Sequence, residues 1–157
     1  MILITLGTQD KQFVRLLKVI DNAIRRGEIK EEVIAQVGHT VYRTSRFKMY
    51  KFMSEKRLNE LIDEADLIVT HGGIGNLTTS LNAKKKIFVM PRLKMYNEHV
   101  NDHQEQIVNE FVNLGYVRRI DSFDDFVKEY KNIKKFKPKF PKFDNTKMLN
   151  IIKDYIG

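Results

Sequence analysis

Cysteine and tryptophan are absent from this chain of 157 residues, and only three prolines occur. Without cysteine the chain forms no disulfide and offers no thiolate for catalysis or zinc binding. Because no run of about 18 apolar residues occurs, we expect no transmembrane helix. The first residues, MILITLGTQD, lack a basic start and a cleavage motif, so we expect no secretory signal. These absences favour a single cytoplasmic domain, for which the length is sufficient.

The positive charge of the chain is concentrated in one segment. Lys and Arg number 28 against 20 acidic residues, which gives a net charge of +8. Between Lys131 and Phe143 lie six lysines and no acid, so this segment alone carries +6. Such a cluster favours an anionic partner, such as a lipid surface or a phosphorylated ligand. Because the rest of the chain is nearly balanced, we expect no nucleic-acid partner.

Short apolar runs alternate with segments of helical periodicity, which is typical of a parallel sheet covered on both faces. We therefore expect a Rossmann-like α/β fold over residues 1–130. Two prolines, Pro138 and Pro141, predict an extended basic linker over 134–143, and a terminal amphipathic helix follows within 131–157. The predicted strands are 1–6, 33–37, 47–53, 67–70, 87–90 and 116–120, and the predicted helices begin near 13, 54, 76, 103 and 122.

Ligands of open parallel sheets bind beyond the carboxyl ends of the strands. Three polar segments are predicted there, at 7–9, 71–79 and 91–104. In the second, glycines 72, 73 and 75 open a helix whose first N–H groups suit a diphosphate, and Thr78 and Thr79 add hydroxyl groups. The alternative is a tight turn that binds nothing.

The segment 91–104 is long for a connection between a strand and a helix, which favours a functional role. Its side chains suit a sugar, whose hydroxyls need several donors and acceptors, although a solvated polar loop is the alternative. His99 and His103 have the spacing of zinc ligands on a helix, but no third ligand is evident, so we predict no metal site. The polar residues are Asn97, Glu98, His99, Asn101, Asp102, His103 and Gln104.

The stretch VTHGGIGNLTTSLNAKKKIFVMPRLKMYNEHVNDHQ resembles the donor-binding half of GT-B glycosyltransferases of family 28. The opening ITLGTQDKQFVRLL agrees with it, and the resemblance covers about residues 1–120. Within the family, the pattern is that of the small bacterial exopolysaccharide glycosyltransferases of the PssE type. These are similar to the catalytic subunit of the eukaryotic two-subunit enzyme that adds the second N-acetylglucosamine to dolichol-linked chitobiose.

The resemblance implies a donor site at the matching positions. It puts the donor diphosphate near the two glycine-containing turns, uracil near Phe52, and the donor sugar at His103 and Gln104. A Glu that binds ribose in the related peptidoglycan enzyme is replaced by Thr79, so Glu98 or another chain would hold ribose. The implied donor-binding residues are Gly7, Thr8, Phe52, Met53, His71, Gly72, Gly73, Ile74, Gly75, Asn76, Thr78, Thr79, Asn101, His103 and Gln104.

The resemblance also implies an activity and partners. The chain would be a UDP-dependent inverting hexosyltransferase subunit that needs no cofactor and no metal. GT-B enzymes have two domains and this chain has one, which implies a membrane-anchored partner carrying the acceptor domain and a lipid-diphosphate-linked saccharide as acceptor in polysaccharide biosynthesis. The chain would then be peripheral at the inner face of the membrane. The general base would be His99, Glu98 or a partner residue.

Two alternatives stay open at this point. The same fold fits a non-catalytic module that binds a nucleotide or only a partner protein. For the segment 131–157 we expect docking onto the partner or an anionic membrane, with Phe136, Phe140 and Phe143 in contact with either. The alternative for this segment is that the terminal helix packs against its own sheet.

Overall fold

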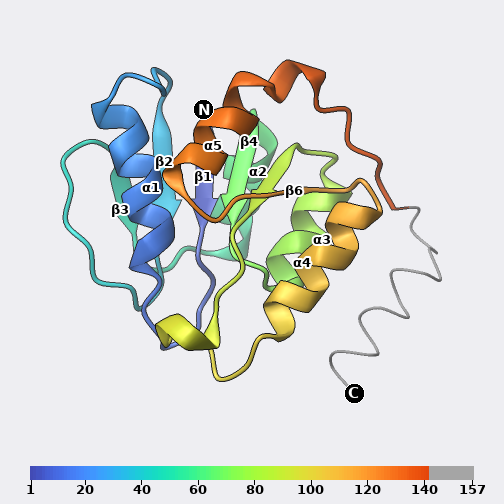
Figure 1. Cartoon of the computed structure of the whole chain (residues 1–157). Helices are drawn as coiled ribbons and strands as arrows, with labels where there is room; N and C mark the ends of the chain where they lie inside the picture. The colour runs from blue at the N-terminus through green and yellow to red at the C-terminus, as the bar shows by residue number, and fades with distance from the viewer. Residues whose placement is uncertain (142–157) are drawn as a thin grey trace.

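The computed structural model describes residues 1–141, which form one parallel six-stranded sheet with helices on both faces (Figure 1). The strand order is β3-β2-β1-β4-β5-β6. The strands are β1 (Ile2–Thr5), β2 (Val33–Gln36), β3 (Lys48–Tyr50), β4 (Leu67–Thr70), β5 (Ile87–Val89) and β6 (Arg118–Arg119). The helices are α1 (Val14–Arg25), α2 (Glu55–Glu64), α3 (Ile74–Asn82), α4 (His103–Asn113) and α5 (Phe123–Lys131), with short 3-10 turns η1 (Lys94–Tyr96) and η2 (Ile133–Lys135).

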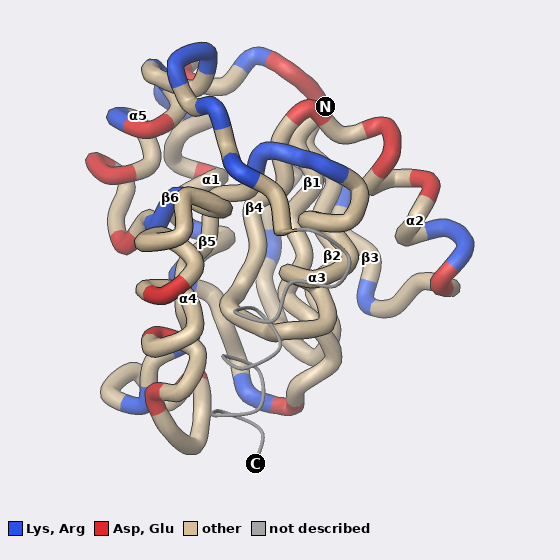
Figure 2. Tube along the Cα trace, turned by 90° about the vertical axis from the view of Figure 1, so that its right-hand side faces the viewer, with Lys and Arg blue, Asp and Glu red and all other residues tan. Residues whose placement is uncertain are grey.

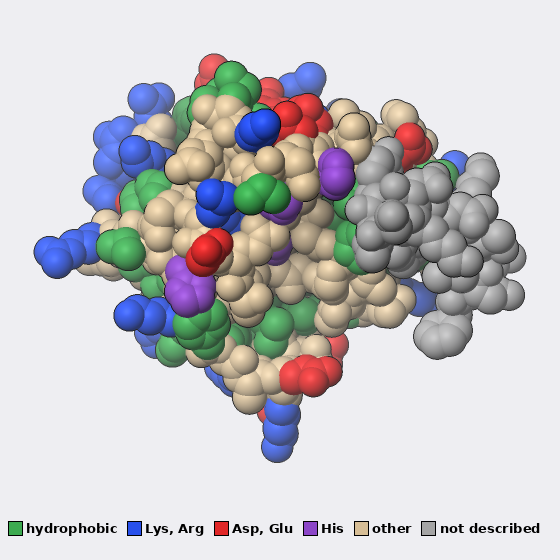
Figure 3. Space-filling view, turned by 90° about the horizontal axis from the view of Figure 1, so that it is seen from below, with side chains coloured by type: hydrophobic (Ala, Val, Ile, Leu, Met, Phe, Trp, Pro, Cys, Tyr) green, Lys and Arg blue, Asp and Glu red, His purple; other side chains and the backbone are tan. Residues whose placement is uncertain are grey.

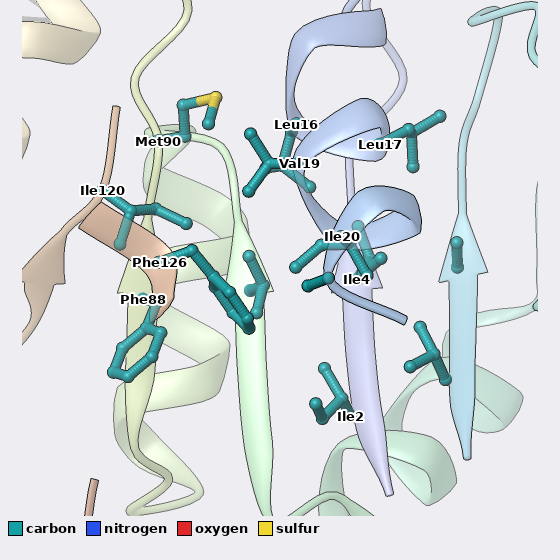
Figure 4. Packing of buried hydrophobic residues seen from close by; sticks show 14 of the residues in the cluster. Ile2, Ile4, Leu16, Leu17, Val19, Ile20, Phe88, Met90, Ile120 and Phe126 are labelled. Atoms are coloured by element: carbon teal, nitrogen blue, oxygen red, sulfur yellow. The ribbon is translucent and has the colours of Figure 1, made fainter. Parts of the chain in front are cut away.

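The four central strands are buried along their whole length, as their unbroken apolar runs predict. Helices α1 and α5 cover one face, and α2, α3 and α4 cover the other. In the first layer, Ile4 of β1 lies in one cluster with Ile20 of α1 and Phe126 of α5 (Figure 4). The predicted α/β fold and its alternating element order are therefore confirmed.

The two edge strands are shorter than predicted. β3 has three residues and β6 has two, whereas the sequence predicts seven and five. Each pairs with one neighbour only, so its ladder has half the hydrogen bonds of a central strand and ends earlier. Helix α3 also begins at Ile74, two residues before the predicted start, and η1 lies in a segment expected to be irregular.

The described part of the basic segment packs on the domain itself. The expectation of an extended chain from 134 is wrong at its start, where η2 forms a turn. Phe136 is 5% exposed inside the core, so it is not available to a partner or a membrane as expected. Phe140 is partly buried against the opposite cluster and keeps part of its surface exposed. Both rings are apolar, and they follow α5 closely enough in the chain to reach the two hydrophobic clusters of the domain. A domain boundary after residue 130 stays a prediction.

Backbone and lysine contacts fix the direction that this segment takes. Lys86 Nζ donates to the carbonyl of Ile133, and the Lys139 N–H donates to the carbonyl of Gly115. Lys86 precedes β5 and Gly115 precedes β6. The segment therefore runs along the edge of the sheet where the strands begin, on the side of the N-terminus (Figure 2). The predicted terminal helix and Phe143 lie outside the described residues. Across residues 1–141, no helix has the length and apolar character that crossing a bilayer requires.

Candidate functional site

The adjacent strands β1 and β4 end side by side and bring two predicted segments together. Thr5 and Thr70 are paired across them. Just beyond, a Cβ at Gly7 would lie 2.6 Å from His71 Nε2, and the φ of +76° at Gly7 is itself one that glycine favours. Gln36 at the end of β2 fixes this turn, because its side chain accepts from the Gly7 N–H and donates to the Gly7 carbonyl.

Helix α3 begins at this junction with open backbone donors. Its N-cap is Gly73, which offers no side-chain acceptor, and the first turn contains no acidic residue. The first N–H groups of a helix have no partner within the helix, and the helix dipole adds partial positive charge there. The start of α3 is therefore suited to an anion.

The three glycines of this turn differ in how much space surrounds them. A Cβ at Gly72 would lie 2.9 Å from the Cβ of Gln104, and one at Gly73 would lie 2.3 Å from His71 Cε1. Contacts within the protein therefore restrict these two positions to glycine. From the sequence alone we expect the approach of a ligand to be the reason. Gly75 differs, because nothing lies within 4 Å of its Cβ position.

Gly75 is thus exposed, sits in the first turn of α3 and has no internal reason to be glycine. A helical glycine costs about 0.5–1 kcal/mol relative to alanine. What it provides is access to the backbone from outside. This is the feature expected where a ligand approaches the helix closely.

The His71 ring lies between the turn after β1 and the start of α3, close to both Gly7 and Gly73. The side chain is 4% exposed, its Nδ1 lies 3.3 Å from Gln104 Nε2, and its Nε2 lies 3.0 Å from the Asn76 amide. Burial, together with the nearby Arg92 cation, lowers the pKa of His71 to about 3. The imidazole is therefore neutral at physiological pH and contributes hydrogen bonds but no charge.

Gln104 is held inside the protein. It is 5% exposed, and its Oε1 accepts the N–H groups of Gly72 at 3.0 Å and Arg92 at 3.1 Å. This oxygen joins the segments that follow β4 and β5, so both of its lone pairs are occupied. Sugar binding by Gln104 stays a prediction, and it would require this oxygen to leave its internal partners. His103, at the start of α4, is exposed.

We expect Gln104→Ala to lower the free energy of unfolding by about 2–3 kcal/mol, because two buried N–H groups lose their acceptor. Chemical denaturation measures this loss. Gln106→Ala on the exposed side of the same helix is the matched control and should change stability by less than about 0.5 kcal/mol. Equal stability of the two variants would contradict the assigned role.

A buried ion network, which the sequence did not predict, holds the loop after β5. Arg92 is 1% exposed, and its guanidinium donates to the carbonyls of Leu6, Lys11 and Glu98. Burial lowers the pKa of Arg92 to about 10, so it remains charged. In the sequence Arg92 lies two residues after the predicted strand 87–90, a position that does not distinguish a buried from an exposed side chain.

Glu98 belongs to this network. It is 4% exposed, Arg15 donates to both carboxylate oxygens at 2.9 and 3.2 Å, and the Leu93 N–H donates to one of them. The carboxylate oxygens of Glu98 are therefore directed into the protein and paired there. The predicted roles of Glu98 as general base or ribose ligand stay predictions, and either would require this pairing to open.

His99 lies at the rim of the same loop, half-buried. Its Nδ1 accepts from the Asn101 N–H at 3.3 Å, and burial lowers its pKa, so the neutral form dominates at physiological pH. With Gln9, Asp10, Lys11 and Val100 it lines a cavity of about 260 Å³. Of the two predicted bases, His99 alone has a neutral side chain at a cavity.

A second cavity of about 460 Å³ lies beyond β2 and β3 and includes Phe52. The Phe52 ring is 52% exposed and meets the edge of His39 at 5.1 Å between centroids. A Cβ at Gly38, in this cavity's wall, would lie 2.4 Å from the Gly7 carbonyl oxygen, so the cavity borders the junction. Met53 packs toward the core. An exposed aromatic ring in an open cavity suits a planar base.

Several histidine side chains are visible on the face seen in Figure 3. Thr8 is exposed, and Ile74 packs partly against the core. The Thr79 hydroxyl donates to the Gly75 carbonyl, whereas Thr78 Oγ1 is buried and has no hydrogen-bond partner. Asn101 accepts from the His103 N–H. Within residues 1–141 no three potential metal ligands cluster.

Known proteins share both the sequence pattern and the fold. The chain is 29% identical over 82 residues to the UDP-N-acetylglucosamine transferase subunit ALG13 of Debaryomyces hansenii, which covers 50% of this chain and 37% of that protein. The chain thus matches well under half the length of that relative.

Two solved structures have the same fold. An NMR solution structure of ALG13 superimposes with a TM-score of 0.60 at 19% identity, over 96% of this chain and 93% of that one. The glycotransferase of kitacinnamycin gives a TM-score of 0.63 at 14% identity, over 99% of this chain and 38% of that one. The glycosyltransferase family 28 C-terminal domain matches residues 1–155, and the chain therefore belongs to this family.

Proposed function

We propose that this chain is the donor-binding subunit of a glycosyltransferase that uses a UDP-sugar. The observation that carries the proposal is Gly75, an exposed helical glycine with open space around it on a helix without a side-chain cap. A diphosphate at this position would accept the free N–H groups of the first turn of α3. The similarity to a UDP-N-acetylglucosamine transferase subunit supports a UDP-sugar as the ligand.

The parts of the donor would follow the geometry of the face. The diphosphate lies over Gly7 and the start of α3, and uracil lies against Phe52 in the neighbouring cavity. The sugar extends toward Asn101 and His103 at the start of α4. Because Glu98 is buried in an ion pair, ribose contacts would come from another group, including one on a second chain.

In the proposed reaction the acceptor hydroxyl attacks the anomeric carbon and inverts it while UDP leaves. The N–H groups at the start of α3 would stabilise the charge that develops on the leaving diphosphate. A base must take the acceptor proton, and we propose His99 or a residue of the partner. Burial lowers the pKa of His99 and keeps its imidazole neutral, but the one lone pair of the neutral ring, at Nδ1, accepts from the Asn101 N–H, so His99 would act as the base once that hydrogen bond is released.

We further propose that a membrane-anchored partner carries the acceptor domain and that the acceptor is a lipid-diphosphate-linked saccharide. The chain would work at the inner face of the membrane through this partner. The word "subunit" in the relative's name supports assembly with a second chain. Docking of the segment 131–157 remains part of this proposal, and only Phe136 is excluded from it because this side chain is buried in the core.

Calorimetric titration with uridine, UMP and UDP tests donor binding. We expect affinity to rise in that order, because each phosphate adds oxygens that accept the N–H groups of α3. CDP is the matched control for the base, and it should bind more weakly than UDP. Equal affinity for uridine and UDP, or no binding of UDP, would contradict the proposal.

A further inference from the structure

Three side chains, Gln104, His71 and Asn76, form a hydrogen-bonded series that ends in the first turn of α3. The series starts at the backbone, where Gln104 Oε1 accepts the N–H groups of Gly72 and Arg92. Gln104 Nε2 then lies 3.3 Å from His71 Nδ1, and His71 Nε2 lies 3.0 Å from the Asn76 amide. The direction of each bond follows from the chemistry of the groups.

Gln104 sets the direction of the first bond. A backbone N–H can only donate, so the Gln104 atom between two of them must be the amide oxygen. The amide nitrogen of Gln104 therefore faces His71 and can only donate. It follows that His71 Nδ1 accepts and carries no proton.

His71 sets the direction of the second bond. A neutral imidazole has one proton, and with Nδ1 bare this proton is on Nε2. Neutrality follows from burial and from the cationic Arg92 nearby, which lower the pKa of His71 to about 3, with His99 acting in the same direction. In the structure Asn76 Nδ2 lies against His71 Nε2, but because Nε2–H donates, the atom there must be Oδ1. The amide is therefore turned over, and its two orientations have the same shape.

We propose that His71 is a positioning residue whose Nε2–H holds Asn76 Oδ1, so that the Asn76 N–H₂ group faces outward at the start of α3. This inference rests on the proposed function, because the ligand of that group would be the donor diphosphate. The amide then adds a further donor to the backbone N–H groups of Ile74 and Gly75 in the first turn of α3. A set of donors prefers a ligand rich in acceptor oxygens.

Nitrogen-15 NMR on ligand-free protein labelled at histidine tests the direction of the series without any nucleotide. We expect the His71 signals to show a proton on Nε2, a bare Nδ1, and no titration between pH 5 and about 8. A proton on Nδ1, or titration of His71 in this range, would overturn the proposal.

Asn76→Asp tests the outward amide. The carboxylate still accepts from His71 Nε2–H and lies in the first turn of a helix, so the melting temperature should hold or rise. Its second oxygen faces the diphosphate, so UDP affinity should fall at least about 100-fold. Asn82→Asp, the same change at the last residue of α3, should leave UDP affinity unchanged.

The outcomes separate this inference from the proposed function. A lower melting temperature of Asn76→Asp would mean that Asn76 donates to His71, which overturns the series. Unchanged UDP affinity of this variant would overturn the contact with the diphosphate. If the unaltered chain fails to bind UDP, the proposed function fails together with the ligand contact, whereas the NMR signals still decide the direction of the hydrogen bonds.

Discussion

Gly75→Asp is expected to reduce UDP affinity by at least about 100-fold while leaving the domain folded. A carboxylate at this position would face the proposed diphosphate, and two unit charges about 4 Å apart repel by about 4 kcal/mol at an effective dielectric constant of 20. The fold should tolerate the change because nothing lies within 4 Å of the Cβ position. Asp in the first turn of a helix is also stabilising by about 0.3–1 kcal/mol.

Gly75→Asp should weaken UDP binding but not the stability of the fold, so unfolding of the variant cannot explain a loss of binding. Calorimetric titration with UDP should show the loss, while the melting temperature stays level or rises. Asn82→Asp adds the same charge at the other end of α3, about 10 Å away along the helix, and should bind UDP like the unaltered chain. Unchanged UDP affinity of Gly75→Asp would remove the diphosphate from α3.

Most of the fold was predictable because its signals are local. The central strands are short apolar runs buried on both faces, and the Ser54 hydroxyl caps α2 at the Arg57 N–H as its sequence predicts. The edge strands were predicted too long, since their length depends on a partner strand and not on their own residues. Phe136 was misplaced because an aromatic between lysines looks the same in a linker and under a helix.

The candidate site was predictable in place but not in detail. The order of the strands brings the turns after β1 and β4 together, and glycine marks both turns. Which polar side chains are buried and which face a ligand depends on contacts between residues far apart in the chain. Gln104 and Glu98 both satisfy such contacts inside the protein, and a sequence of polar residues gives no sign of which ones are buried.

Sugar transfer by the purified chain alone is expected to be undetectable, although the chain binds UDP. Residues 1–141 form one sheet, and in the proposed enzyme the acceptor binds to a second domain on the partner. Without that domain the acceptor hydroxyl is not held at the donor, and such positioning contributes about 7–11 kcal/mol to reactions of this kind. Loss of a base on the partner would remove a further factor of about 10²–10⁴.

The measurement compares transfer of radiolabelled sugar to a lipid-diphosphate-linked saccharide by the chain alone and by the chain with its co-expressed partner. Transfer should require both proteins, and Gly75→Asp should abolish it in the presence of the partner because no donor binds. UDP binding without transfer in both preparations would instead favour a non-catalytic nucleotide-binding module. Robust transfer by the chain alone to a soluble acceptor would contradict the two-chain proposal, because the acceptor would then need no second protein to reach the donor.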